Sequence, residues 1–225
     1  MPKIPRSFEV LQLEISIYLD PTIMNQEIDV TGISEKKLKK YQLMIHILNK
    51  ATDKVLAYER YFSDFYPSVN SITPHEALEH HIHAYLADLT ILKHAMIGLI
   101  SSLKNDVPAI ASNKEEMREF FDKCKAATYR RFNNVKENRD PHSHARSRFI
   151  DSDLLRSDSM SSMTQEGNPV LDYLKPEAAE RMKKESAELF IKQKEYWCGV
   201  ARRNAEGLSK EVENLYISLE APICM

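Results

Sequence analysis

Glycine and cysteine are scarce in this chain of 225 residues, which has 5 glycines and 3 cysteines. So few glycines disfavour turn-rich β architectures, whereas the Lys, Glu, Leu and Ala that dominate the periodic segments favour long helices. The cysteines, Cys124, Cys198 and Cys224, are far apart and form no C-x-x-C pair. They therefore suggest neither a disulfide framework nor a thiolate metal site, and they fit a reducing cytoplasm.

The chain also lacks an excess of charge of one sign and a membrane-targeting segment. Its 31 basic and 33 acidic residues give a net charge of −2, which excludes a protein-wide field that attracts polyanions. Any contact with nucleic acid must therefore be local. Residues 1–6 do not lead into a signal-peptide core, and no apolar run approaches the length of a bilayer span. We expect a soluble, cytoplasmic protein with no membrane partner.

Four periodic segments predict long helices. The first begins at Ser34 and continues to about Tyr66, and the third opens at Asn113. The last runs from Pro176 to about Leu219. Each carries apolar residues at spacings of three and four, which place them on one helix face. The segments therefore predict amphipathic helices that pack through their apolar faces.

The second periodic segment has the clearest pattern. Thr73 is expected to cap it, with Pro74 at the first helical position and Glu76 completing a capping box. Its apolar residues alternate spacings of four and three, which is typical of the buried seam of a helical bundle. The seam consists of Leu78, Ile82, Tyr85, Leu89, Leu92, Met96, Leu99 and Leu103. The predicted fold class is all-α, an antiparallel (up-down) bundle of four to five helices.

We expect one domain over residues 34–220, preceded by an extension, residues 1–33. Within the extension, residues 8–19 alternate like a strand and also recur like a helix face, and helix is favoured because a lone strand would have no partner. Residues of about 151–175, rich in Ser, Asp and Met, lack sustained periodicity. They are expected to form an irregular insertion.

The last periodic segment is too long for a compact bundle. As one unbroken helix it would measure roughly 65 Å at about 1.5 Å per residue. We therefore expect that Gly199 or Gly207 bends it, or that a second subunit packs on it.

The densest concentration of reactive side chains is the stretch Glu137–Arg146, between the third and last segments. Asp140 followed by Pro141 has the form of a helix start, with Asp140 as N-cap. His144 would then lie in the first turn, where the helix dipole disfavours imidazolium and keeps the ring usable as a base. Cleavage of RNA by its 2′-hydroxyl needs such a group and a fixed cation, for which Arg139 is of the right type.

Basic residues gather around this stretch. Residues 123–148 contain eight Lys and Arg and only two acidic residues. Such a cluster is suited to holding a phosphate backbone. A solvated helix face is the other reading and, for a charge cluster taken alone, the commoner one. The side chains predicted to bind RNA phosphates are Arg130, Arg131, Lys136, Arg146 and Arg148.

The spacing of Arg139 and His144 resembles the R-x4-6-H signature of the HEPN superfamily of small helical ribonucleases and nucleotide-binding proteins. The resemblance implies a four-to-five-helix bundle that dimerises so that two motifs face one cleft, and that cuts RNA without a metal or other cofactor. It implies that Arg139 positions or stabilises the scissile phosphate, that Asp140 is the polar residue after the arginine, and that His144 is the acid/base group. His142 is within reach and has no family role.

Three functional hypotheses follow. The first is a homodimeric, metal-independent endoribonuclease, a toxin or defence effector whose partners are RNA and an antitoxin. The second is a non-catalytic helical module of the same fold that binds a nucleotide or a protein partner. The third is a metal-binding bundle, because His80 and His83 share a helix face and His94 or His144 would complete a site. Histidines that border a leucine seam are more often boundary residues with satisfied hydrogen bonds.

Overall fold

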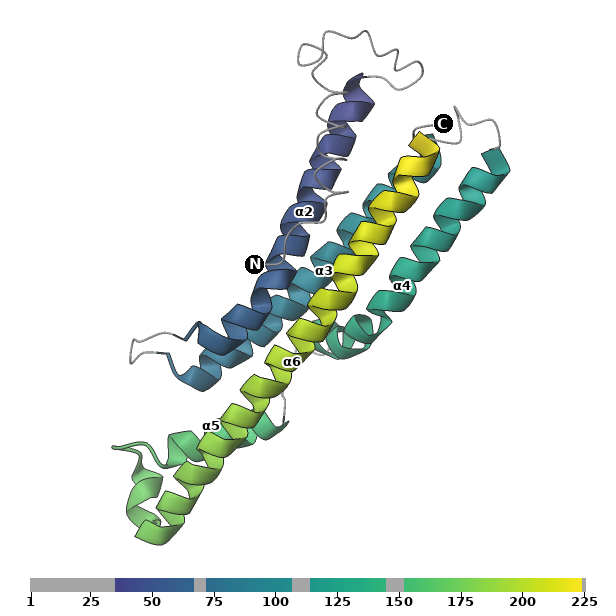
Figure 1. Ribbon diagram of the computed structural model, residues 1–225. Helices are drawn as coiled ribbons and strands as arrows, with labels where there is room; N and C mark the ends of the chain where they lie inside the picture. The colour runs from purple at the N-terminus through teal and green to yellow at the C-terminus, as the bar shows by residue number, and fades with distance from the viewer. Residues whose placement is uncertain (1–34, 67–71, 107–113, 145–151, 224–225) are drawn as a thin grey trace. The chain divides into compact units, whose positions relative to one another are not determined.

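Helices make up the part of the chain that the structure describes. The computed structural model describes residues 35–66, 72–106, 114–144 and 152–223, without the side chains of residues 35, 37–38, 134–144 and 216–223. The elements in Figure 1 are α2 (Glu35–Asp64), α3 (Pro74–Asp106), α4 (Lys114–His144), α5 (Ser152–Met163), the 3-10 helix η3 (Pro169–Tyr173) and α6 (Pro176–Ile223). No strand occurs among these residues, and the predicted all-α fold class is confirmed. The extension 1–33 lies outside them.

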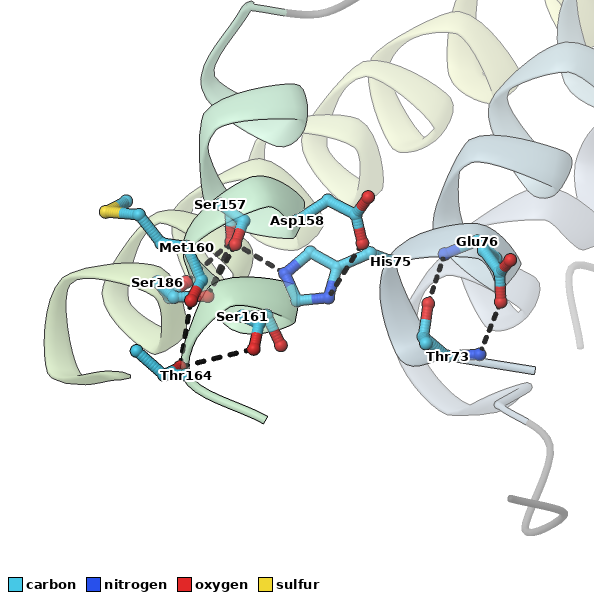
Figure 2. Close-up of polar contacts among 9 residues, drawn as sticks. All are labelled: Thr73, His75, Glu76, Ser157, Asp158, Met160, Ser161, Thr164 and Ser186. Carbon is cyan, nitrogen blue, oxygen red and sulfur yellow. Dashed lines mark hydrogen bonds and ion pairs between the residues drawn. The ribbon is translucent and has the colours of Figure 1, made fainter. Parts of the chain in front are cut away.

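A capping box fixes the start of α3, as the sequence predicted. The backbone N–H of Glu76 donates to Thr73 Oγ1 at 3.1 Å, and the backbone N–H of Thr73 donates to the Glu76 carboxylate at 2.7 Å (Figure 2). Pro74 is the first helical residue, where its missing N–H removes no helical hydrogen bond. The two reciprocal bonds satisfy backbone donors that the helix leaves open. The first turn of α3 is therefore held by local contacts.

The chain divides into two compact units, and four helices contribute to both. The first unit contains the residues up to Asp53, Leu89–Asn134 and the residues from Ala205 onward. The second contains Lys54–Asp88 and Val135–Asn204. Accordingly α2, α3, α4 and α6 each supply one part to each unit, whereas α5 and η3 belong to the second unit.

In the first unit, α2 and α4 both pack antiparallel to α3. Tyr41, near the start of α2, donates to the carboxylate of Asp106 at the end of α3. Lys104 of α3 pairs with Asp122 near the start of α4, with 2.6 Å between Nζ and Oδ2. The largest fully buried side chains of this unit are Leu48, Leu89, Leu92, Met96, Leu99, Phe121 and Phe132.

In the second unit, α6 packs antiparallel to α2. Arg202 Nε donates to the Glu59 carboxylate at 2.8 Å. Trp197, which precedes Arg202 on α6, contacts Phe62, which follows Glu59 on α2. The two helices therefore run in opposite directions. The two ring centroids are 6.1 Å apart, a distance at which aromatic pairs attract. Phe62 is fully buried and Trp197 is 6% exposed, so this pair belongs to the core of the unit.

The predicted seam of α3 is buried over its whole length. None of its eight residues, Leu78 to Leu103, is more than 5% exposed. A large apolar side chain contributes roughly 1.5–3 kcal/mol when it is fully buried, so this row is a main source of stability. By length and composition α3 is also the one described helix that could cross a bilayer, which the sequence prediction did not expect. The core helix of a soluble protein passes the same test, and 39% of the apolar window of α3 is buried.

Helix α5 occupies residues that were predicted to be irregular. The prediction of an irregular insertion over about 151–175 is wrong for Ser152–Met163, which form α5. Its buried residues are Leu154, Ser157 and Met160, and the buried Thr164 follows. A search for apolar periodicity misses this face because two of its four positions carry hydroxyl groups. Burial of these two hydroxyl groups costs little stability, because both donate hydrogen bonds to backbone carbonyls.

Neighbouring aromatic residues on α4 and on α6 differ in burial. The described buried residues of α4 are Phe121, Thr128 and Phe132, whereas Phe120 is only partly buried. Thr128 is tolerated inside because its hydroxyl donates to the Cys124 carbonyl at 3.1 Å. On α6, Trp197 faces the core, while its neighbour Tyr196 is 55% exposed.

Helix α6 is continuous. Its 48 residues correspond to about 72 Å at about 1.5 Å per residue, and it neither ends nor restarts at Gly199 or Gly207. Because α6 takes part in both units, no single unit has to cover its whole length. The alternative that a second subunit packs on α6 stays a prediction.

Candidate functional site

The Arg139–His144 motif lies at the end of a helix, not at the start of one. Helix α4 runs from Lys114 through Asp140 and Pro141 to His144, so the predicted helix start at Asp140 and Pro141 is wrong. Proline inside a helix removes one hydrogen bond and crowds the carbonyl four residues earlier, and here it stands only three residues before the helix ends. His144 therefore occupies the last turn, where the helix dipole favours a cation. The argument for a ring kept neutral by the dipole no longer holds.

The contacts of the motif itself stay predictions. The structure describes residues 134–144 by their backbone alone, and residues 145–151 lie outside its description. The predicted site residues in these two groups are Lys136, Arg139, Asp140, His142 and His144 in the first, and Arg146 and Arg148 in the second.

The helical backbone constrains how Arg139 and His144 can act together. The two positions are five residues apart, which corresponds to about 140° around the axis of a regular α-helix. Residues three or four apart share a helix face, whereas residues five apart do not. A site that uses both positions therefore needs either a departure from helix geometry at His144 or a second copy of the chain.

Arg130 and Arg131, predicted to bind phosphate, have different surroundings. Both are exposed on α4. The guanidinium of Arg131 lies against the backbone of α6 at Gly207. A Cβ atom added to Gly207 would be only 1.6 Å from Nη2 of Arg131. Arg131 therefore packs against α6 and needs the missing side chain at Gly207 to do so. Arg130 is the more suitable of the two for contact with a ligand.

Charge pairs occur in the first half of α4. Lys123 pairs with Glu119 one turn earlier, with 2.8 Å between Nζ and Oε1, and Asp122 pairs with Lys104 of α3. The hydrogen bond and charge of each raise the pKa of Lys123 and lower that of Glu119. The positive charge of α4 is therefore concentrated in its later half, beginning at Arg130.

His80, His83 and His94 do not form the alternative metal site together, and the side chain of His144, the other candidate third ligand, lies outside the description. Positions 80 and 94 are 14 residues apart on one helix, about 21 Å along its axis, so His80, His83 and His94 cannot share an ion. Among the described residues no group of three potential ligands is close enough to hold a metal. His81 Nε2 is 2.7 Å from the Phe65 carbonyl. For His81, the interpretation as a boundary residue with a satisfied hydrogen bond is confirmed.

A buried polar cluster in the second unit was not predicted. His75 from the first turn of α3, Ser157 and Asp158 of α5, and Ser186 of α6 meet at one point (Figure 2). His75 Nε2 is 2.7 Å from Ser157 Oγ, and the Ser157 hydroxyl donates to the Ser186 carbonyl at 2.7 Å. The Ser186 hydroxyl in turn donates to the Ser157 carbonyl at 2.7 Å. Ser157 is fully buried and His75 is 8% exposed.

The number of protons in this cluster fixes the tautomer of His75. A serine hydroxyl has one proton, and both serines donate theirs to backbone carbonyls. Ser157 Oγ can therefore only accept from the ring, so His75 Nε2 must carry the ring proton. Nδ1 is then bare, and among the described residues it has no hydrogen-bond partner. Its closest charged neighbour is Asp158, at 3.9 Å from Oδ1.

The combination of Ser157, His75 and Asp158 resembles a hydrolytic triad in composition but not in function. In a triad, the ring nitrogen that faces the serine accepts its proton, and the carboxylate receives a hydrogen bond from the other nitrogen. Here Nε2 donates to the serine, and 3.9 Å is too long for a hydrogen bond from Nδ1. Ser157 is also sealed from solvent. The cluster therefore holds helices together and does not provide a nucleophile.

Burial sets the titration of His75. Loss of solvation lowers the pKa of His75 below its ordinary 6.5, and the charge of Asp158 opposes this in part. The ring also stands in the first turn of α3, where the helix dipole disfavours a cation. On its other side the ring of Phe190 is 4.9 Å away, centroid to centroid. His75 is therefore neutral at physiological pH.

No family model matches this chain, and no match was found among curated proteins or among solved structures.

Proposed function

We propose that the chain is a metal-independent endoribonuclease of the HEPN type, with its reacting groups at the end of α4. The observation that carries the proposal is that positions 139–144 form the end of α4, a helix whose earlier residues include the exposed Arg130. Exposed arginines of this kind supply the cations that hold phosphate groups. Neutralisation of the first half of α4 concentrates the positive charge near the motif.

In the proposed reaction, the 2′-oxygen of a ribose attacks the adjacent phosphorus. The bond to the 5′-oxygen of the next nucleotide breaks, and a cyclic phosphate remains. His144 transfers the proton, from the 2′-hydroxyl or to the departing 5′-oxygen, and Arg139 stabilises the charge on the phosphoryl oxygens.

We propose further that each site takes its two groups from two copies of the chain. The spacing of about 140° around the helix separates positions 139 and 144 within one copy. In a homodimer with facing α4 ends, Arg139 of one copy would act beside His144 of the other. This arrangement resolves the geometric conflict without distortion of α4.

The test of activity uses the purified full-length protein and total RNA, with and without EDTA. Cleavage that persists in EDTA and is reduced by about 100-fold or more in His144→Ala and Arg139→Ala supports the proposal. Arg118→Ala is the matched charge control, because Arg118 is exposed on the neutralised half of the same helix. His46→Ala, an exposed histidine on α2, is the matched histidine control. Both controls should keep full activity.

Other outcomes decide against the proposal. Cleavage that EDTA abolishes would indicate a metal-dependent enzyme. Absence of cleavage by the folded protein would favour the non-catalytic module that binds a nucleotide or a protein partner. Equal loss of activity in Arg118→Ala and Arg139→Ala would mean that general charge matters and that the motif does not.

The shared site has a test of its own. His144→Ala and Arg139→Ala, each inactive alone, are mixed, unfolded together and refolded so that mixed dimers form. If sites are shared, a mixed dimer keeps one site with both groups, and activity returns to about one quarter of the unaltered level. If each copy uses its own two groups, the mixture stays inactive.

A further inference from the structure

We propose that His75, Ser157 and Ser186 form an acid-sensitive latch that holds α5 on α3 and α6 at neutral pH and releases it when the His75 ring takes up a second proton. The latch lies in the second unit, and it does not depend on the proposed ribonuclease activity.

Three helices meet in the latch, and each contributes one side chain (Figure 2). His75 belongs to α3, Ser157 to α5 and Ser186 to α6. The reciprocal serine bonds join α5 to α6, and the bond from His75 to Ser157 joins both to α3. Ser157 takes part in all of these contacts, so it is the central member. If Ser157 moved away, α5 would lose its latch hydrogen bonds to α3 and to α6 together.

At neutral pH every proton in the latch has an acceptor. The ring donates from Nε2, both serines donate to carbonyls, and Nδ1 carries only a lone pair. This lone pair is buried and has no hydrogen-bond donor facing it among the described residues. Nδ1 is therefore the place where a second proton would be added.

A second proton has no adequate partner in the closed latch. The Nδ1 proton would face Asp158, but the 3.9 Å separation is too long for a hydrogen bond, and the carboxylate is 45% exposed, so solvent screens its charge. The other neighbours are apolar or neutral: the Phe190 ring and Ser157. An imidazolium enclosed in this way lacks the paired, hydrogen-bonded counterion that buried charges need.

Several other charged groups on the surrounding helices have partners elsewhere. On α3, Glu76 closes the capping box and Glu79 faces His83 at 3.6 Å. Between α5 and α6, Arg156 pairs with Glu185, and Lys192 Nζ is 3.1 Å from the Asp153 carboxylate. Asp158 is therefore the charged group that bears most directly on the ring. Protonation of His75 is favoured once α5 has moved away and water reaches Nδ1.

Backbone hydrogen exchange of the full-length protein at pH 7.5 and pH 5.5 tests the latch. After correction for the intrinsic pH dependence of exchange, the amides of α5 should lose protection by up to about tenfold per pH unit below pH 6.5. Amides within the buried seam of α3 should lose much less. In His75→Gln, the side-chain amide keeps a donor towards Ser157 but does not titrate. The acid-induced loss in α5 should disappear in this variant.

A second variant and a spectroscopic measurement keep the test decisive if His75→Gln folds poorly. In Asp158→Asn, an amide N–H can donate to Nδ1, so α5 should be more protected at pH 7.5 and should release at a lower pH. The ring-nitrogen chemical shifts of His75 in the unaltered protein should show the neutral Nε2–H tautomer. The proposal is overturned by an Nδ1–H tautomer, by unchanged α5 protection between pH 7.5 and 5.5, or by equal acid sensitivity in folded His75→Gln.

Discussion

Helices α3 and α5 are held in the protein by different chemistry. The eight seam residues of α3 are apolar or aromatic, and none is more than 5% exposed. Within the 12 residues of α5, the buried side chains are Leu154, Ser157 and Met160. Hydrogen bonds and ion pairs also join α5 to α6, from Asp153 to Lys192 and Gln193 and from Arg156 to Glu185.

This difference predicts different responses to mutation and to pH. Apolar burial is non-directional, so the seam should lose stability in proportion to the surface removed and should not depend on pH. A hydrogen-bonded cluster needs every donor and acceptor to be matched, so the latch should fail as a unit. Perturbations placed in one helix and then in the other can therefore test whether the contrast is real.

The largest effect is expected from the seam. Leu92 is fully buried on α3, and Leu92→Ala should lower the free energy of unfolding by about 2–5 kcal/mol, because it removes apolar contacts and leaves a cavity. Urea denaturation measures this loss. Ile91→Ala is the control. Ile91 is the residue next to Leu92 and is 49% exposed, so its truncation should lower the free energy of unfolding far less. Similar losses for the two variants would mean that the seam is not the main core.

The next largest effect is expected from the centre of the latch. Ser157→Ala leaves the His75 Nε2–H and the Ser186 carbonyl without their partner, and each unmatched buried group costs about 1–3 kcal/mol. The loss should appear as faster hydrogen exchange in α5 and leave the seam of α3 largely protected. Ser162→Ala, at an exposed position of the same helix, should leave exchange in α5 unchanged. Uniform loss of protection across both helices would remove the distinction between them.

The pH dependence should separate the two helices further. Because burial holds the pKa of His75 below 6.5, the unfolded chain binds a proton between these two pKa values and the folded protein does not. The contribution of His75 to stability is therefore complete above about pH 6.5 and falls with decreasing pH until the folded pKa is passed, by at most about 1.4 kcal/mol per pH unit. Urea denaturation at pH 7.5, 6.5 and 5.5 measures it. Leu92→Ala should keep this dependence, and His75→Gln should lose it.

The smallest effect is expected from the capping box at the start of α3, which Thr73 and Glu76 form. Thr73→Ala removes the hydroxyl that accepts from the Glu76 N–H and should lower the free energy of unfolding by about 1 kcal/mol. Thermal denaturation followed by circular dichroism is sufficient to detect it. Thr52→Ala is the control, because the Thr52 hydroxyl bonds within α2, to the Leu48 carbonyl, and not at a helix end. An equal decrease in both variants would show that the cap has no special role.

The parts of the fold that sequence could predict depend on local signals. The seam of α3 follows from spacing within one helix, and the cap at Thr73 follows from a partner three residues away, so both were predicted. Helix α5 could not be predicted in this way, because its buried Ser157 is stabilised by a residue of another helix. At Asp140 and Pro141, a valid local signal for a helix start was overridden by the continuation of α4.

The same reasoning applies to the candidate sites. In the latch, His75 and Ser157 are 82 residues apart in the sequence, and Ser157 and Ser186 are 29 residues apart. A short sequence motif cannot encode contacts between residues so far apart. The Arg139–His144 motif is local and could be recognised from sequence. Its chemistry depends on how the side chains converge in space, and a spacing pattern does not contain that information.

The contacts of α6 with α2 have a consequence for folding during synthesis. Arg202 and Glu59 are 143 residues apart, whereas Tyr58 of α2 bonds Asp88 of α3 across only 30 residues. Contacts between distant residues form slowly because a long loop must close first. On the ribosome, α2 and α3 can pair long before α6 exists, and Phe62 then lacks the Trp197 ring that meets it in the finished protein. A partly made chain therefore presents an aromatic surface for chaperones that the completed chain no longer offers.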